Sequence, residues 1–497
     1  MKKINLLVMS LVSAAALSFS SCSSDNDLGG GASGGNSQVD GFYMTLAIQT
    51  PTSNGTRTAQ SNEAPATADE SDVTTGTFYL VDALGNVTFS KTISAADWQD
   101  KKNPTQGQIG KKQLEIRVEN VAAGAKYKVY FLANITDAKP WENTIQAESP
   151  FAKPFDTPKH FAMFNQNDNG YNNITGMDGN GYTVVFTDDN KKSDNAAEVK
   201  YNGVTAPIKI ERITARIDQP KTGTTDVIAS IEGKENIVAT EPEKSAMADA
   251  KDKVESITMK QYAITNLANT TYIMQKWNEK QLQIPTSATG FTYYQPATAL
   301  GSATKLANAS YFKPITTEGA SEYVFENHSD ENATTMYFEY EVKLNKNKFE
   351  TTADFEDGTF YRYNNKIYNS FAGIRKAYKE VVGLFDGKTD EELVAELTAA
   401  KNDATDPEAA IATFRETYKI EVFNKGKTYY HTVIKDNFIG YDNAIQRNSV
   451  YQLTVNNIFN VGAQVPNGTP DKNALFYLDV TVSVNPWVLN TQDVNLQ

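Results

Sequence analysis

Cysteine and histidine are almost absent from this chain of 497 residues, which contains one cysteine and three histidines. A single cysteine cannot form an intramolecular disulfide, so an exported fold has to be held by its core alone. His160, His328 and His431 are far apart and have neither HExxH nor any other paired-ligand spacing. A histidine-based zinc site and a Ser-His-Asp site are therefore not supported. We predict no metal and no cofactor.

Sequence signatures of catalysis are also missing. The chain has no P-loop, no GxSxG and no GxGxxG in a dinucleotide-binding context. Residues 165–170 begin like a calcium loop, but Gly176 stands where a bidentate glutamate is needed, so a polar loop is the better interpretation. Carboxylates are abundant, although sequence alone does not pair two of them across a cleft. We predict that the protein is not an enzyme.

Basic residues are outnumbered by acidic ones, 47 to 60, which gives a net charge of −13. A chain of this charge would be repelled by phosphates, so we expect no nucleic-acid partner. No apolar run after the first 21 residues is long enough to span a membrane. The composition, 40% hydrophobic and 11% aromatic, can fill β-rich cores, and the length predicts two or three domains.

The N-terminus has the pattern of a secretory signal peptide, predicted here as residues 1–21. Two lysines open it, and an apolar run too short to cross a bilayer stably follows. Cys22 comes next, as in a bacterial lipobox, with Phe19 where leucine is usual. Residues 23–27 resemble the surface-export tag of Bacteroidales lipoproteins, and a glycine-rich tether follows. We predict acylation of Cys22 with palmitate; the alternative is an ordinary signal peptide cleaved nearby.

Alternating apolar residues predict an all-β fold. Period-2 patterns and short apolar runs, with turn residues between them, are typical of a β-sandwich. The predicted strands of a first domain are 42–48, 77–81, 87–89, 114–118, 127–134, 182–186 and 208–217. In the first of them Phe42, Met44, Leu46 and Ile48 form one apolar face.

A charged stretch poor in aromatic residues, 221–253, predicts a domain boundary. A second series of strands follows it, at 256–259, 337–344, 428–434, 450–458 and 475–484. Helical spacing over 373–385, a capping box at 389–392 and a helix opening at Asp406-Pro407 predict a helical insertion in this second domain.

The two ends of the chain carry similar apolar ladders. Arg57 is the first arginine, and it stands with Thr58 in a polar loop that an arginine-specific protease can reach; it can equally be a solvated loop residue. Cutting there would remove the first ladder and leave an open sheet edge, which another chain can complete by adding a strand. At the C-terminus the ladder is followed by Asn485-Pro486, which we expect to break the strand, and by a second extended arm. The residues of this expected polymerisation arm are Phe476, Leu478, Val480, Val482, Val484, Trp487, Val488 and Leu489. Both arm segments can also be plain closing strands of the second domain, and which of them enters a neighbour is open.

A set of motifs follows in order along the chain: Cys22, Phe42-Tyr43-Met44-Thr45-Leu46 with Arg57, and residues 127–134, 211–216, 447–455 and 484–489. This ordered set resembles the fimbrillins, the stalk subunits of type V pili in the Bacteroidales, and most of all their longer, minor-fimbrium major subunit type. The resemblance extends over nearly the whole chain and is loose between about 221 and 425.

The resemblance implies two tandem transthyretin-like β-sandwiches in a structural subunit of a cell-surface fimbrium. The precursor would be anchored to the outer membrane by its lipid, cut after Arg57, and polymerised by donor-strand exchange. Its partners would be identical subunits, accessory tip and anchor pilins, the arginine-specific protease and host or bacterial surface ligands, in support of adhesion and biofilm formation. The segments are then the signal peptide 1–21, a propeptide 22–57 with the removable strand, domains 58–220 and 221–473, and the arm 474–497.

A lipid-tethered surface glycan-binding protein of a nutrient-uptake system is the alternative. Its sandwiches would display aromatic platforms, which Tyr293, Tyr294, Tyr361 and Tyr363 could build.

Overall fold

The protein is mostly β-strand. The computed structural model describes residues 41–49, 64–66, 70, 73–94, 97, 111–146, 161–166, 181–222, 226–234, 239–278, 281–285, 293–294, 312–329, 332–436, 444–466 and 478–489, which lie within one compact unit. Strands predominate in these ranges, and four α-helices accompany them. The predicted all-β fold class is therefore confirmed.

An eleven-stranded sheet contains the strands of the N-terminal part. Its main path is β10-β1-β13-β8-β6-β9-β11-β12, with β3 paired to β4 and β6, and β5 paired to β1. One face buries a core of alternating side chains, such as those of Leu80, Val129 and Ile210. The strands are β1 (Phe42–Gln49), β3 (Thr75–Val81), β4 (Val87–Ser94), β5 (Lys111–Val118), β6 (Lys126–Ala133), β8 (Met163–Asn165), β9 (Tyr182–Val185), β10 (Ala197–Glu198), β11 (Lys200–Tyr201), β12 (Val204–Thr205) and β13 (Ile208–Arg212).

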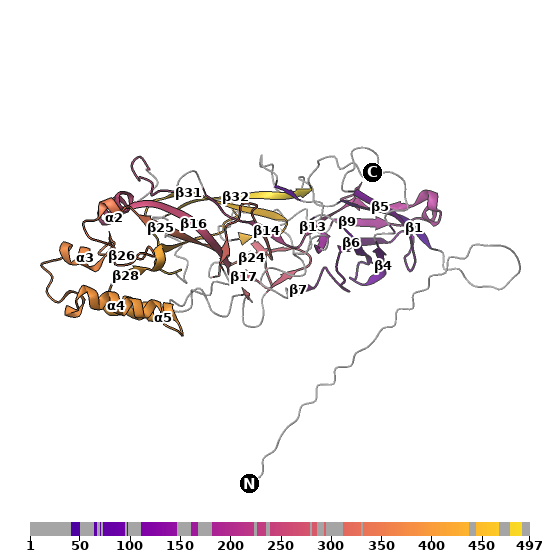
Figure 1. Cartoon of the computed structure of the whole chain (residues 1–497). Helices are drawn as coiled ribbons and strands as arrows, with labels where there is room; N and C mark the ends of the chain where they lie inside the picture. The colour runs from indigo at the N-terminus through magenta and orange to yellow at the C-terminus, as the bar shows by residue number, and fades with distance from the viewer. Residues whose placement is uncertain are drawn as a thin grey trace, which may run out of the picture. The chain divides into compact units, whose positions relative to one another are not determined.

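A six-stranded sheet contains β2, from the N-terminal part of the chain, and β32, the last strand described. Figure 1 shows its longest strands, β31 and β32, side by side. Its order is β2-β32-β31-β14-β23, with β15 also paired to β31. The strands are β2 (Ala64–Ala66), β14 (Ala215–Asp218), β15 (Lys221–Thr222), β23 (Ser321–Val324), β31 (Ser449–Ile458) and β32 (Leu478–Leu489). The chain leaves the first sheet after Arg212 and enters this one at Ala215.

A four-stranded sheet packs on the six-stranded one. Its order is β22 (Lys313–Pro314), β16 (Val254–Thr265), β25 (Thr335–Leu344) and β29 (Lys427–Val433). Ile217 and Leu453 of the six-stranded sheet share one core with Ile257 and Phe338 of the four-stranded sheet. Burial of such side chains contributes about 1.5–3 kcal/mol each to folding.

The arm strand β32 continues through Pro486, so the expected break at Asn485-Pro486 is wrong. Pro486 lies opposite Ser449, the first residue of β31, where the pairing between the two strands ends. Proline is tolerated at such an end because no further ladder bond to this neighbour needs its missing N–H. Beyond it, residues 487–489 pair with β2 instead.

Four short strand pairs and one three-stranded sheet complete the described β-structure. They are β7 (Thr144–Gln146) with β18 (Thr270–Tyr272), β17 (Leu267–Ala268) with β21 (Tyr293–Tyr294), β19 (Lys276–Asn278) with β20 (Gln281–Gln283), β24 (Asn327–His328) with β30 (Ala444–Ile445), and β26 (Phe360–Tyr363) with β27 (Lys366–Tyr368) and β28 (Glu421–Phe423). The β7–β18 pair connects a segment that follows β6 of the first sheet to one that follows β16.

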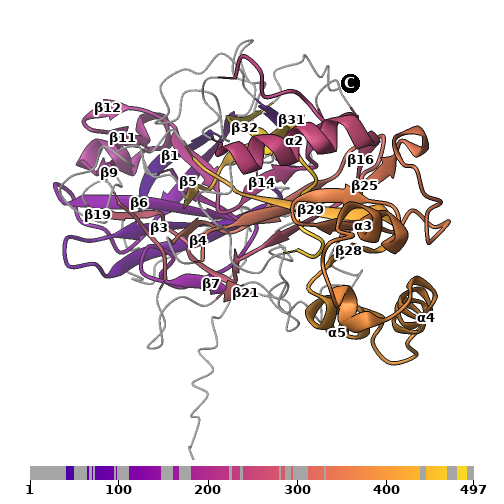
Figure 2. The same ribbon diagram turned by 90° about the vertical axis from the view of Figure 1, so that its left-hand side faces the viewer.

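Helix α2 (Glu241–Lys253) lies within the stretch read from the sequence as a charged boundary. Thr240 and Glu243 form a capping box at its start, and only Ala246, Met247 and Ala250 of the helix are buried. Ala250 reaches the core shared with β16, beside which Figure 2 shows the helix. The Thr-x-x-Glu spacing was the available signal for this helix.

Helices α3 (Phe371–Ala377), α4 (Asp390–Lys401) and α5 (Pro407–Tyr418) lie between β27 and β28 in the chain. Thr389 caps α4 in a capping box with Glu392, and Asp406 caps α5 ahead of Pro407, as the sequence predicts. The three helices share an apolar cluster that includes Phe371, and α4 and α5 lie together in Figure 2.

Asp354 connects helix α3 to the loop that precedes β26 and makes the stability of this region depend on pH. Its Oδ2 accepts a hydrogen bond from the backbone N–H of Phe371 at 2.8 Å. Burial raises the pKa of Asp354 from its ordinary value of 3.8 to about 6. The stability that protonation of Asp354 contributes is therefore complete below its unfolded-state pKa and is lost as the pH rises through about 6.

We expect Asp354→Asn to raise the thermal midpoint relative to the parent at about pH 7.5 and to give no such gain at about pH 4. The neutral amide keeps a carbonyl acceptor for Phe371 without a charge to desolvate. Thermal unfolding of both chains at the two pH values checks this. A gain of equal size at both would contradict it.

Candidate functional site

Strand β1 occupies the interior of the first sheet. On one edge it pairs antiparallel with β5 along all eight of its residues. On the other edge it runs parallel to β10 at Met44 and Thr45 and to β13 at Ile48 and Gln49. Within the described part of the chain, β5 has no other strand neighbour. Removing β1 would therefore leave β5 without its strand partner and separate it from β10 and β13.

The apolar face predicted for β1 is buried. The exposed fractions of Phe42, Met44, Leu46 and Ile48 lie between 0% and 5%, while the side chains between them are half-buried. The Phe42 ring packs on Phe186 with centroids 5.4 Å apart. The strand thus supplies every second side chain to the core of the first sheet as well as the backbone partners of its neighbours.

Strand β32 pairs on one edge with β31 in an antiparallel ladder from Leu478 opposite Ile458 to Pro486 opposite Ser449. On its other edge the described residues contain β2 alone, which pairs with residues 487–489. Val480 packs against the core between the sheets. Seven of the expected arm residues, from Leu478 to Leu489, therefore lie on one continuous strand; Phe476 lies outside the described residues.

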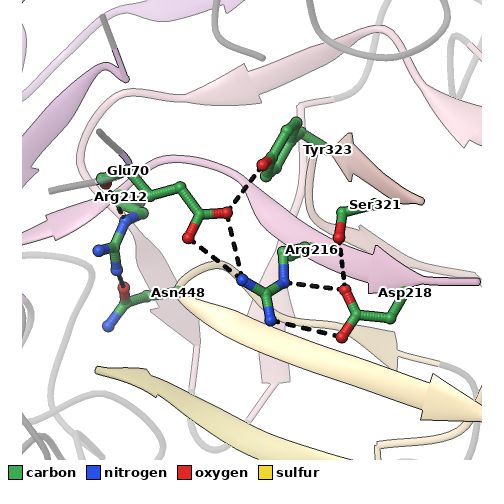
Figure 3. A network of polar contacts seen from close by, with 7 residues as sticks. All are labelled: Glu70, Arg212, Arg216, Asp218, Ser321, Tyr323 and Asn448. Carbon is green, nitrogen blue, oxygen red and sulfur yellow. Dashed lines mark hydrogen bonds and ion pairs between the residues drawn. The ribbon is translucent and has the colours of Figure 1, made fainter. Parts of the chain in front are cut away.

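Glu70, which follows β2 in the chain, binds side chains of the six-stranded sheet. Figure 3 shows the network of polar contacts around it. The side chain is 4% exposed, and its carboxylate accepts hydrogen bonds from Arg216 Nη1, 3.2 Å from each oxygen, and from Tyr323 Oη at 2.7 Å. Arg216 Nε also lies 2.9 Å from Asp218 Oδ1, which accepts a bond from Ser321 Oγ. Such paired, buried charges are costly to break one partner at a time.

Arg212 links the same segment to the turn before β31. Its Nε donates to the Glu70 carbonyl at 2.6 Å, and its Nη1 donates to Asn448 Oδ1 at 2.9 Å (Figure 3). Asn448 adopts the left-handed conformation, with a φ of 53°, and its N–H donates to the Thr214 carbonyl. Burial lowers the pKa of Arg212 to about 9, and the nearby charge of Glu70 opposes that shift.

Arg447, the neighbour of Asn448, makes a second buried link. It pairs with Glu326 at 2.7 Å, both side chains being 1% exposed, and its Nη1 donates to the Ile273 carbonyl. Nη2 also donates to the Tyr272 carbonyl at 2.6 Å, so Arg447 holds strand β18, which pairs with β7. Arg212 and Arg447 lie in stretches that carry the family resemblance, 211–216 and 447–455, but these roles were not predicted; a charged residue within an apolar strand pattern was the available signal.

Other residues singled out from the sequence either lie outside the described ranges or have a role different from the one considered. Cys22, Arg57 and Thr58 lie outside the described residues. Tyr361 is fully buried against Phe371, with ring centroids 4.4 Å apart, so it cannot belong to an exposed aromatic platform. Asn165, from the supposed calcium loop, instead bonds to the β6 backbone through the Phe131 N–H and the Val129 carbonyl.

Metal binding and membrane crossing find no support in the described ranges. No group of three or more histidine, cysteine, aspartate or glutamate side chains there is placed to hold a metal ion. None of the helices described is both long enough and apolar enough to span a bilayer.

Comparison with known proteins identifies the C-terminal part of the chain. Residues 421–493, which contain β28 to β32, match the family described as "Major fimbrial subunit protein type IV, Fimbrillin, C-terminal". No curated protein matches the sequence. The match assigns this part of the chain to the C-terminal region of a fimbrial subunit. The resemblance to the fimbrillins is thereby confirmed for residues 421–493.

Solved structures resemble the chain only distantly. Two are proteins of Parabacteroides distasonis provisionally described as cell adhesion proteins, one at 13% identity with a TM-score of 0.45, covering 91% of this chain and 99% of its own. The other has 14% identity and a TM-score of 0.43, covering 90% and 98%. A fimbrial assembly protein of the same organism has 13% identity and a TM-score of 0.31, covering 62% and 82%.

Because one face of β1 is buried, we expect that shortening a side chain on this face strongly lowers the free energy of unfolding. In the uncut chain, Leu46→Ala should lower the free energy of unfolding by about 2–5 kcal/mol, because it leaves a cavity at a fully buried position. Thr45→Ala, on the half-buried opposite face, is the matched control and should cost less than about 1 kcal/mol. Urea unfolding measures both. Equal costs would show that this face of β1 does not hold the sheet.

Proposed function

We propose that the protein is a structural subunit of a cell-surface fimbrium, a type V pilus, that supports adhesion and biofilm formation. The precursor is exported as a lipoprotein acylated at Cys22 and held at the outer membrane. An arginine-specific protease cuts it after Arg57, and the mature subunit, built from two tandem transthyretin-like sandwiches, polymerises by donor-strand exchange.

The observation that carries this proposal is the placement of β1. It is an interior strand with buried alternate side chains, and it precedes Arg57 in the sequence. A cut between Arg57 and Thr58 separates β1 covalently from everything that follows. Loss of β1 leaves backbone groups of β5, β10 and β13 without their partners, which is costly in a buried position. A strand from another subunit restores both the ladder and the core.

The donor in this proposal is the C-terminal arm. Residues 476–484 of the arm alternate apolar and polar residues as β1 does, residues 487–489 continue as three apolar residues, and β31 is the main neighbour of β32 in its sheet. Burial of apolar surface in the vacated groove contributes roughly 25 cal/mol per Å², so several side chains outweigh the entropy of ordering an arm. Partners in assembly are identical subunits, with accessory tip and anchor pilins at the ends of the polymer.

Maturation should depend on Arg57. N-terminal sequencing of polymerised subunit should begin at Thr58, and Arg57→Ala should leave an uncut chain that still carries β1 and stays monomeric. Arg57→Lys keeps the charge and is the matched control for protease specificity: it should also remain uncut. Polymer of normal length from Arg57→Ala would contradict the proposal.

Assembly should depend on the distal arm. A cut subunit that lacks residues 487–497 should form no heat-stable ladders, because it has lost the segment beyond β31 that can leave for a neighbour. Removal of 490–497 alone is the control, since it keeps all of β32. Electrophoresis without boiling and electron microscopy read out assembly. Normal ladders from the longer truncation would place the donor in residues 478–486 or elsewhere.

A further inference from the structure

The last residues of β32 are held by a segment close to the expected cut. Ala64, Pro65 and Ala66 of β2 pair in parallel with Trp487, Val488 and Leu489. In sequence, β2 lies between Arg57 and the buried residue Glu70. The contact therefore joins the start of the mature chain to the segment that the proposed function assigns as donor.

The β2–β32 pairing is weak by itself. It has three residue pairs, one of which contains proline, and Pro65 has no N–H to donate. A single hydrogen bond contributes little net stability, because both groups can bond to water instead, so a ladder this short is readily opened. By contrast, β32 has a nine-pair ladder with β31. The outer three residues can consequently separate while the rest of the strand stays paired.

Glu70 supplies the anchor that this short ladder needs. It follows Ala66 by four residues, and Arg216, Tyr323 and Arg212 hold its carboxylate and its carbonyl. These partners belong to β14, β23 and β13, none of which is part of the arm (Figure 3). Glu70 thus fixes the C-terminal side of β2 to the body of the subunit.

We infer that Ala64–Ala66 and Glu70 form a clamp that retains residues 487–489 on their own subunit and has to open before the arm reaches a second copy of the chain. This inference rests on the proposed function, which makes that segment the donor. In the uncut chain β2 is tethered on both sides, through Gln49 of β1 and through Glu70. A cut after Arg57 leaves the tether at Glu70 alone, which lowers the effective concentration of β2 at the arm. The same cut therefore frees β1 to leave its groove and loosens the donor.

Hydrogen exchange of the unpolymerised chain tests the clamp independently of assembly. Peptides covering residues 484–489 should exchange about tenfold faster in Glu70→Gln than in the parent, both in the uncut Arg57→Ala background, a factor that corresponds to about 1.4 kcal/mol. Glu421→Gln is the matched control, because it breaks a bidentate pair between β28 and β26, which belong to a sheet other than that of β2 and β32. Unchanged exchange in Glu70→Gln, or an equal rise in Glu421→Gln, would overturn the inference.

A reversible lock tests whether the clamp opens during assembly. Ala66 and Leu489 are direct register partners, so Ala66→Cys with Leu489→Cys places two cysteines opposite each other in a mature chain that no longer carries Cys22. After mass spectrometry confirms the crosslink, the oxidised cut subunit should form no ladders, and reduction should restore them. Each single-cysteine variant is the control and should assemble in both states.

The outcomes separate the two proposals. Normal ladders from the crosslinked subunit would overturn the clamp and leave strand exchange standing. If the parent and the reduced double variant both fail to assemble after the cut, the proposed function fails, while faster exchange in Glu70→Gln would still establish the clamp in the isolated chain.

Discussion

The two-sided pairing of β1 is the constraint on which the proposed assembly depends. A strand at a sheet edge can leave at the cost of one ladder, but β1 is bonded to β5 on one side and to β10 and β13 on the other. Its alternate side chains also fill the core. A subunit without β1 therefore has unmet backbone bonds and an open apolar groove at once, and only an extended strand satisfies both. Cleavage would thereby supply the driving force for polymerisation.

The first sheet can respond in this way because the rest of the chain is joined by buried charges that do not involve β1. Arg447 and Asn448 are adjacent in sequence but bind different parts of the chain. Arg447 donates hydrogen bonds to Glu326 and to the backbone carbonyl of Ile273, while Asn448 accepts a hydrogen bond from Arg212. The side chains of Arg212, Arg447 and Glu326 are almost fully buried, so removing the partner of such a charge leaves it uncompensated. These contacts connect the sheets without the participation of β1.

Local patterns in the sequence predicted much of the fold. The alternation at Phe42 to Ile48 and the capping box at Thr389 both describe what the structure contains, because burial of one strand face and satisfaction of a helix end are local demands. Contacts between residues that are far apart in the sequence could not be predicted. Nothing local shows that Glu70 meets Arg216, 146 residues away, or that Pro486 ends one ladder and not the strand. The burial of Tyr361 could not be predicted because an aromatic side chain in a short strand can face either side of it.

The direction of the proposed exchange follows from comparing ladders. On its own subunit, the segment from residue 487 onwards has three described parallel pairs with β2, one of them at a proline. The groove that β1 fills offers eight antiparallel pairs with β5 and further parallel contacts on the other side. Antiparallel pairing is slightly more stable per residue, and the groove adds apolar burial. An arm that moves from β2 into a neighbour's groove therefore exchanges a short ladder for a longer one with a core beneath it, which favours the polymer once β1 has gone.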